Sequence, residues 1–249
     1  MPILYNLSLY LVFGLAVLVF ILLFFISAPY GKFSRKGWGP AVKSKWAWLV
    51  MEFPSPVLML LFFLISPYKG APQVLFVIFW LLHYVHRTFY YPFRQSGRNK
   101  PYPQVIVLMA IIFNSLNGFI NGYGVFHVYN YDAGWLLSWQ FITGAILFVC
   151  GYSINKTADE KLSMLRSQNQ QGYVIPRGWL FSYISCPHYF GEIIEWCGWA
   201  VMTWSLPGLS FFVFTFANLF PRAIASHKWY RANFPDYPEK RKAVIPFII

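Results

Sequence analysis

Three ionisable residues fall on one face of an apolar stretch that covers residues 186–207. His188, Glu192 and Glu195 are spaced i, i+4 and i+7, and Trp199 follows at i+11, so a helix would present all four on one side. Ionisable groups in lipid are costly unless they face a polar cavity or a partner. A solvated helix end would be the simpler explanation, but two acids and a histidine in one stripe favour a functional site.

Another acid, Glu52, lies in an earlier apolar stretch and is followed by Pro54 and Pro56. Two prolines so close together should bend or break a membrane helix, and broken helices in membranes usually line a cavity. The alternative is a juxtamembrane acid in contact with water. A glutamate in apolar surroundings can stay protonated at neutral pH, and a protonated carboxyl group can donate a hydrogen bond to a carbonyl oxygen.

A third apolar stretch places an arginine among aromatic residues. Its shared helical face carries Trp80, Tyr84, Arg87 and Tyr91. Aromatic stripes are more often packing or an interfacial belt, but a buried Arg87 needs an anionic partner. Tyr84 could lie beside Glu52 if the two spans are neighbours. His83 and His86 suggest a metal site, yet the chain has five histidines and no further pair, so we expect no metal.

A polar helical face follows the fifth apolar run. It carries Asn155, Asp159, Leu162 and Arg166, and the same side of the predicted bundle also collects Arg98, Tyr173, Arg222 and Tyr230. Arginines bind phosphates through a planar fork of donors, and tyrosines can stack on a nucleotide. A bulky anionic cofactor would explain this set, although a solvated helix extension is the simpler alternative. Neither a Gly-x-Gly-x-x-Gly fingerprint nor a P-loop is present, so the helices themselves would have to bind a nucleotide.

The composition is that of a membrane protein. Of the 249 residues 57% are hydrophobic and 11% are charged, whereas soluble domains carry about 25% charged residues. The net charge of +12 does not indicate nucleic acid, because the basic residues lie between apolar runs rather than in one stripe. The three cysteines lie in apolar stretches and predict neither a disulfide framework nor a zinc cluster.

Apolar runs long enough to cross a bilayer occur at residues 3–28, 46–66, 72–93, 104–126, 135–155, 179–203 and 207–226. Lysine and arginine concentrate in the first, third and fifth connections and in the tail, whereas the second connection has only Lys69 and the fourth and sixth have none. This alternation predicts an all-α bundle of seven spans, with the N-terminus outside or lumenal and the C-terminus cytoplasmic. We expect one membrane domain over residues 1–249, as a monomer in the lipid bilayer.

Several motifs, taken in order, resemble one family nearly from end to end. They are Trp48-Leu-Val-Met-Glu52-Phe-Pro-Ser, Leu-His83-Tyr84-Val-His-Arg87, Asn155 through Arg166, Gly191-Glu192-Ile-Ile-Glu195-Trp196, and Asp236-Tyr-Pro-Glu-Lys-Arg-Lys-Ala-Val-Ile-Pro246. The chain resembles the steroid 5α-reductase family (3-oxo-5α-steroid 4-dehydrogenase), and most closely its type 2 members. The Ala28-Pro-Tyr30-Gly-Lys32 segment matches as well.

The resemblance implies a membrane reductase that uses NADPH to saturate the 4,5 double bond of a 3-oxo-4-ene steroid. Glu52 and Tyr84 match the pair that hydrogen-bonds the steroid ketone, and Trp196 matches a steroid-lining tryptophan. Positions that match cofactor contacts are Trp48, Arg98, Asn155, Asp159, Arg166, Tyr173, Glu192, Arg222 and Tyr230, and His188 stands where type 2 members have asparagine. The membrane would be the endoplasmic reticulum in a eukaryote or the inner membrane in a bacterium.

Other functions stay open at this point. The stretch Cys186-Pro-His-Tyr-Phe-Gly-Glu192 also resembles a motif of membrane methyltransferases that use S-adenosylmethionine, and related reductases of enoyl-CoA or polyprenol substrates are similar there. A receptor or transporter is a further alternative. A methyltransferase would not need the Glu52 and Tyr84 pair, so we favour the reductase.

Overall fold

The apolar runs of the sequence become helices in the computed structural model, which describes residues 1–169 and 172–249. The helices are α1 Pro2–Phe25, α2 Ser44–Glu52, α3 Pro54–Leu64, α4 Ala71–Val85, α5 Tyr91–Arg94, α6 Gln104–Tyr123, α7 Trp139–Gln168, α8 Pro187–Thr203 and α9 Leu206–Asn233. Two strands, β1 Ala41–Lys43 and β2 Pro101–Pro103, pair antiparallel. The predicted all-α class is confirmed.

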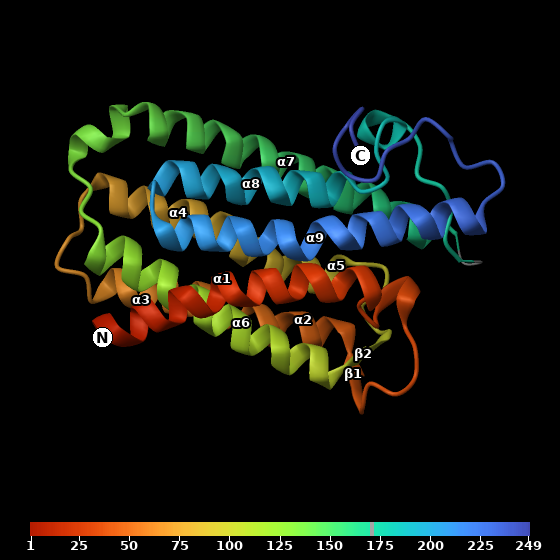
Figure 1. Ribbon diagram of the computed structural model, residues 1–249, viewed down its shortest axis with the longest axis horizontal. Coiled ribbons are helices and arrows are strands. Elements are labelled where there is room, and N and C mark those ends of the chain that lie inside the picture. The colour runs from red at the N-terminus through yellow and green to blue at the C-terminus, as the bar shows by residue number, and fades with distance from the viewer. Residues whose placement is uncertain (170–171) are drawn as a thin grey trace.

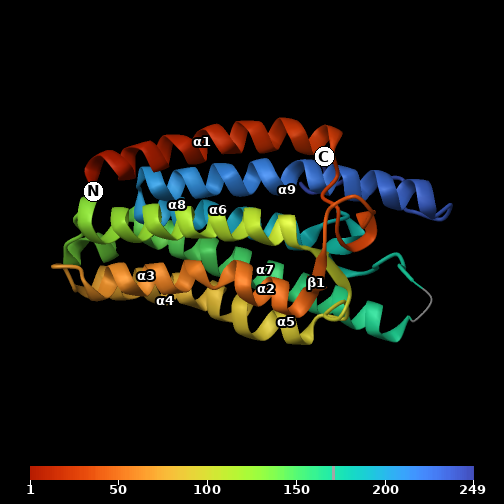
Figure 2. The same cartoon turned by 90° about the horizontal axis from the view of Figure 1, so that it is seen from below.

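The helices lie along one long axis, and the two ends of the molecule hold different segments (Figures 1 and 2). The N-terminus and the connections α3–α4, α6–α7 and α8–α9 lie at one end. The strands, residues 172–186 and the tail 234–249 gather at the other end, which we call the basic end. All connections rich in lysine and arginine reach the basic end, whereas those at the opposite end carry Lys69 alone.

Four helical segments of the described chain are long and apolar enough to cross a membrane, which indicates an integral membrane protein. They are Pro2–Phe25, Ser44–Leu64, Gln104–Val128 and Leu206–Asn233. Helices α4 and α8 have 15 and 17 residues, which is shorter than the roughly 20 residues of a typical span, and the apolar part of α7 continues into a charged C-terminal half. Seven spans and their orientation therefore remain a prediction.

The predicted proline break lies between α2 and α3. Helix α2 ends at Glu52 and α3 begins at Pro54, while Phe53 keeps right-handed helical angles of φ −55° and ψ −37°. The chain therefore continues in nearly the same direction, and the interruption is local. Glu52 thus lies at the last position of a helix rather than in a wide bend.

The tightest helix contact joins α7 to α8 through glycines spaced by seven residues on each helix: Gly144 and Gly151 on α7, Gly191 and Gly198 on α8. A Cβ atom on Gly151 would lie 2.3 Å from the backbone nitrogen of Glu195, and one on Gly191 would lie 2.4 Å from that of Asn155. The two backbones approach this closely because no side chain separates them. This seam brings the polar residues of α7 against those of α8.

Aromatic side chains fill the centre of the bundle. The fully buried members include Phe76, Trp80, Phe126, Phe148, Trp196 and Trp199. The polar residues of α6 pack into the same interior: Asn121 Nδ2 donates to Asn117 Oδ1 at 2.9 Å, and Trp199 Nε1 donates to Asn121 Oδ1 at 2.9 Å. Gly118 and Gly122 lie against Leu58 and Phe62 of α3. This region is closely packed, and the two asparagines bond to each other and to Trp199.

Candidate active site

A cavity of about 390 Å³ lies among the helix ends at the basic end. Its wall combines the segment after α1, the start of α2, the charged half of α7, the first turns of α8 and the last turns of α9. The predicted site residues that line it are Trp48, Asp159, Arg166, Tyr173, His188, Glu192, Arg222 and Tyr230. The polar face of α7 and the polar stripe of α8 therefore meet in one place.

Arg87 lies between two acids in this wall. Its Nη1 atom donates to Asp159 Oδ2 at 3.1 Å, and its Nη2 atom lies 3.8 Å from Glu192 Oε2. The guanidinium also lies over the rings of Trp48 and Tyr91, at 4.5 and 4.8 Å from their centroids. The anionic partner expected for a buried arginine is present twice, and the guanidinium holds α2, α7 and α8 together at the cavity.

A π-helix, η2 (His86–Tyr90), carries Arg87 toward this wall. It follows α4 directly and changes the hydrogen-bond pattern of that helix for one turn. Segments of this kind are frequent at functional sites. The periodicity of the sequence indicates a face for Arg87 but does not reveal the π-helix.

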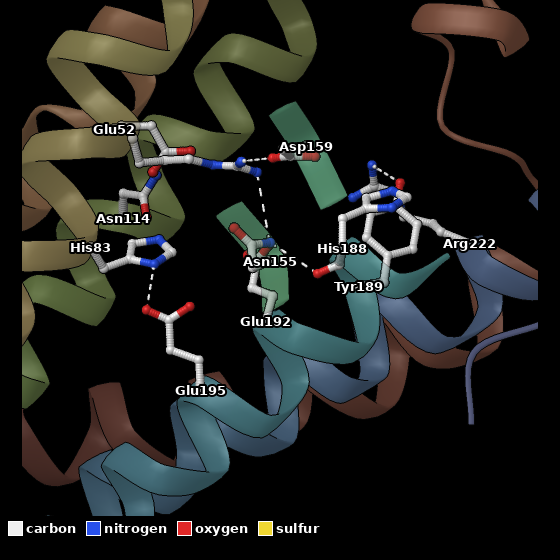
Figure 3. A network of polar contacts seen from close by, with 11 residues as sticks. Glu52, His83, Asn114, Asn155, Asp159, His188, Tyr189, Glu192, Glu195 and Arg222 are labelled. Atoms are coloured by element: carbon white, nitrogen blue, oxygen red, sulfur yellow. Dashed lines mark hydrogen bonds and ion pairs between the residues drawn. The ribbon is translucent and has the colours of Figure 1, made fainter. Parts of the chain in front are cut away.

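Asn155 does not line the cavity itself but holds two residues of its wall in place. Its Nδ2 atom donates to the backbone oxygen of His188 at 2.9 Å and to Glu192 Oε2 at 3.3 Å (Figure 3). Arg98 lies outside the wall: its Nη1 atom donates to the backbone oxygen of Phe93 at 2.9 Å, and its side chain is exposed. A direct contact of Arg98 with a cofactor therefore remains a prediction that this geometry does not favour.

Four cations face the cavity without an acidic partner among the described residues: Lys32, Lys100, Arg166 and Arg222. Each lies over aromatic rings instead. Lys32 Nζ is 4.3 Å from the ring of Tyr230, and the guanidinium of Arg166 is 5.4 Å from that of Tyr173. Unpaired cations in a half-buried cavity attract anionic groups such as phosphates.

Lys32 and Tyr189 are cavity residues that sequence reasoning did not single out. Burial, with a smaller contribution from the nearby Arg166, lowers the pKa of Lys32 to about 8. The Tyr189 hydroxyl accepts a hydrogen bond from Arg222 Nη2 at 3.0 Å (Figure 3). The sequence does contain a sign that Lys32 belongs to the site, because the Ala28-Pro-Tyr30-Gly-Lys32 segment is one of the motifs that carry the family resemblance.

The stripe of α8 divides between two environments. His188 and Glu192 line the cavity. Glu195, by contrast, is fully buried against His83, and the Trp199 ring nitrogen donates a hydrogen bond to Asn121 in the packed interior. The Nδ1 atom of His188 is buried and has no hydrogen-bond partner among the described residues. A buried ring nitrogen without a partner at a cavity wall is available to a ligand.

The predicted ketone-binding residues do not line this cavity. Glu52 Oε2 accepts a hydrogen bond from Asn114 Nδ2 at 3.4 Å, and the buried Tyr84 stacks on Trp80 with a centroid distance of 5.0 Å. Glu52 and Tyr84 make no direct hydrogen bond in the part of the chain that the structure describes. Trp196 lies beside Tyr84, with a centroid distance of 5.9 Å.

These three residues nevertheless lie directly inward of the cavity wall. Each occupies the same helical segment as a cavity residue, one turn further from the basic end: Glu52 after Trp48 on α2, Tyr84 before Arg87 on α4 and η2, and Trp196 after Glu192 on α8. One turn is about 5 Å along the axis. The polar cavity and the aromatic centre are thus two adjoining layers of the bundle, an outer and an inner layer of the candidate site.

Comparison with known proteins identifies the family of the chain. A family model described as 3-oxo-5-alpha-steroid 4-dehydrogenase matches residues 100–249. Steroid 5-alpha-reductase DET2 of Arabidopsis thaliana is 48% identical over 237 residues, which are 92% of this chain and 90% of the relative. The chain belongs to the steroid 5-alpha-reductase family. As a member of it, the protein is an oxidoreductase that acts on CH–CH groups.

Mammalian members of the steroid 5-alpha-reductase family match over similar lengths. The bovine 3-oxo-5-alpha-steroid 4-dehydrogenase 1 is 39% identical over 248 residues (96% of this chain, 95% of the relative), and the human one is 37% identical over 225 residues (89% and 86%). These relatives do not favour a methyltransferase. They are plant DET2 and mammalian type 1 enzymes, so the closer resemblance to type 2 members stays a prediction.

Proposed function

We propose that this chain uses NADPH to reduce the 4,5 double bond of 3-oxo-4-ene steroids, giving 5α-reduced 3-oxosteroids. The observation that carries the proposal is the layering of the site: a cation-lined cavity at the basic end, and one turn inward the residues Glu52, Tyr84 and Trp196. The relatives are named steroid 5-alpha-reductases and 3-oxo-5-alpha-steroid 4-dehydrogenases, and these names support the reduction of a steroid at this position.

The outer layer fits NADPH. Lys32, Arg166 and Arg222 have no acidic partner among the described residues and can bind its phosphates, and Tyr173 and Tyr230 offer rings for stacking. The remaining wall residues that would contact it are Trp48, Asp159, His188 and Glu192, and Asn155 would contact it from beside His188 and Glu192. When bound, NADPH supplies the hydride for the β-carbon of the enone.

The inner layer would bind the substrate. A protonated Glu52 and the Tyr84 hydroxyl would donate hydrogen bonds to the 3-oxo group, where negative charge develops during the reduction. Donors that are already in place at such an oxygen stabilise the transition state. The buried rings of Trp80 and Trp196 would line the steroid and exclude water from the reacting carbons.

We also propose that all seven helical passes cross the membrane, with the basic end in the cytoplasm. The basic residues of that end favour the cytoplasmic side, where NADPH is available. The chain would act as a monomer, in the endoplasmic reticulum if its source is eukaryotic, as the relatives are. A cysteine scan of residues 127–134 tests the orientation, because labelling of this connection from the cytoplasmic side would contradict it.

Incubation of membranes containing the protein with NADPH and progesterone or testosterone tests the activity. Mass spectrometry should show a product that has gained one hydride and one proton, and chromatographic co-elution with a 5α-reduced standard should establish its stereochemistry. Controls with NADH and with S-adenosylmethionine should give little or no product. A methylated product, or binding of NADPH without reduction of any 3-oxo-4-ene steroid, would contradict the proposal.

A further inference from the structure

A buried histidine–glutamate pair joins α4 to α8 and takes no part in the mechanism above. His83 Nδ1 lies 2.8 Å from Glu195 Oε1, and the two side chains are 6% and 0% exposed (Figure 3). The second carboxyl oxygen of Glu195 is buried without a hydrogen-bond partner among the described residues. The carboxyl group is therefore held by one contact, to one residue of another helix.

Such a pair is a costly way to join two helices. Removing two polar groups from water costs more than their attraction returns in many proteins, and well-packed apolar residues often replace a buried pair without loss of stability. The cost is higher at membrane depth, and an ionisable residue there is by default a sign of function. Fold stability alone does not account for His83 and Glu195.

The pair lies at the depth of the proposed substrate site. His83 precedes Tyr84 on α4, and Glu195 precedes Trp196 on α8. The His83 ring is 5.0 Å from the Tyr84 ring and 4.7 Å from the Trp196 ring. One hydrogen bond thus connects the backbones that carry two of the three residues proposed to contact the steroid.

The position of His83 near the end of α4 is a second reason to assign the pair a positioning role. Helix α4 ends at Val85, and the π-helix His86–Tyr90 begins one residue later. Helices often kink where the hydrogen-bond pattern changes in this way, so contacts with neighbouring helices help to set the direction of the last turn of α4. A bond from His83 to a fixed point on α8 sets that direction, and the seam of α7 and α8 holds α8 in place.

We propose that His83 and Glu195 form a positioning pair for steroid reduction. Their hydrogen bond fixes the last turn of α4 against α8, and so sets the direction of the Tyr84 hydroxyl relative to Trp196 and the bound ketone. This inference rests on the proposed function. It predicts that loss of the hydrogen bond lowers the rate of the chemical step, while NADPH affinity is retained because neither residue lines the cavity.

The test uses variants that separate folding from positioning. His83→Phe keeps a ring between Tyr84 and Trp196 but removes the hydrogen bond, and the double variant His83→Phe/Glu195→Leu leaves no unpaired polar group. The double variant should fold as well as wild type by thermal unfolding and bind NADPH within about twofold. Its kcat should fall by about tenfold to a hundredfold, with a smaller change in steroid KM, because slight misplacement of a donor has effects of that size.

A conservative variant and a matched control complete the experiment. Glu195→Gln keeps an acceptor for His83 Nδ1 and should retain most of kcat. Tyr131→Phe removes another buried contact to α8, the 2.7 Å hydrogen bond from Tyr131 Oη to the Thr203 backbone oxygen. Thr203 is the last residue of α8, about two turns beyond Trp196, so this variant should leave kcat unchanged.

Two results would overturn the inference: a double variant with wild-type kcat, or a Glu195→Gln protein as slow as the double variant. Failure of the wild-type protein to reduce any steroid would instead overturn the proposed function. The two failures are therefore distinguishable in the same set of assays.

Discussion

The two layers of the site are built from different interactions. At the basic end, Arg87 joins two acids, and unpaired cations face a cavity of about 390 Å³. One turn inward, large rings pack closely, and Trp80, Trp196 and Trp199 are each 1% exposed or less. In the function that we propose, this difference is a division of work: charge would recognise an anionic cofactor in the outer layer, and shape with a few hydrogen-bond donors would recognise an apolar substrate in the inner layer.

If this division is correct, changes in each layer should have separable effects. The largest effect that we expect concerns the outer layer. Arg87→Leu leaves Asp159 and Glu192 without their cation, and removing one partner of a buried pair costs about 3–5 kcal/mol. Thermal unfolding in detergent should show a clear loss of stability. Arg177→Leu breaks the exposed Arg177–Asp236 pair, with side chains 65% and 68% exposed, and should cost less than about 1 kcal/mol. Equal losses in the two variants would show that the Arg87 cluster is not structural.

Tyr84→Phe probes the inner layer. The ring keeps its stacking on Trp80, so folding and NADPH affinity should stay as in wild type. Loss of one donor at the ketone oxygen should lower kcat on the order of a hundredfold. Steady-state kinetics with a 3-oxo-4-ene steroid measure this effect. An unchanged kcat would remove Tyr84 from the proposed donor pair.

A change in the seam between α7 and α8 should affect both layers together. Gly151 lies one turn before Asn155 on α7 and packs against the backbone of Glu195 on α8. Gly151→Ala places a Cβ atom 2.3 Å from a backbone nitrogen, and overpacking of this kind costs about 1–3 kcal/mol. Thermal unfolding should show the loss. Gly14→Ala is the matched control, since a Cβ atom there has nothing within 4 Å, and it should be neutral or slightly stabilising. A tolerated Gly151→Ala would mean that the helices are further apart than described.

The smallest expected effect is a pH dependence confined to the outer layer. Burial lowers the pKa of Lys32 from 10.5 to about 8, so Lys32 is charged below that pH and becomes neutral above it. NADPH affinity should therefore fall several-fold as the pH rises from 7 to 9. Lys32→Arg should bind NADPH with little change over this range, because arginine stays charged. An identical pH profile in the variant would exclude Lys32 as the group responsible.

Much of the outer layer could be predicted from the sequence. The shared face of Asn155, Asp159 and Arg166 on α7 follows from helical periodicity alone, and so does the shared face of His188 and Glu192 on α8. The break at Glu52 follows from Pro54, which cannot donate a backbone hydrogen bond. These features are local, and local spacing is what a sequence records directly.

The partners of these residues could not be predicted in the same way. Arg87 needed an acid, but the choice of Asp159 and Glu192 depends on which helices are neighbours. The bond between His83 and Glu195 spans 112 positions and has no local pattern. The glycines of α7 and α8, spaced by seven residues, were a usable sign of a close helix contact, although the spacing does not say which helix is the partner.

The division between the layers is tested most directly by one parallel measurement on Glu52→Ala and Arg166→Ala. NADPH dissociation constants and steroid turnover would be determined in the same preparations, with thermal unfolding to confirm folding. We expect Arg166→Ala to weaken NADPH binding about tenfold or more, as for a lost charged hydrogen bond of about 1.5–3 kcal/mol, with steroid affinity little changed. Glu52→Ala should bind NADPH like wild type and turn over on the order of a hundredfold more slowly, with Glu52→Gln between the two. Wild-type turnover in Glu52→Ala, or wild-type NADPH affinity in a folded Arg166→Ala protein, would contradict the account.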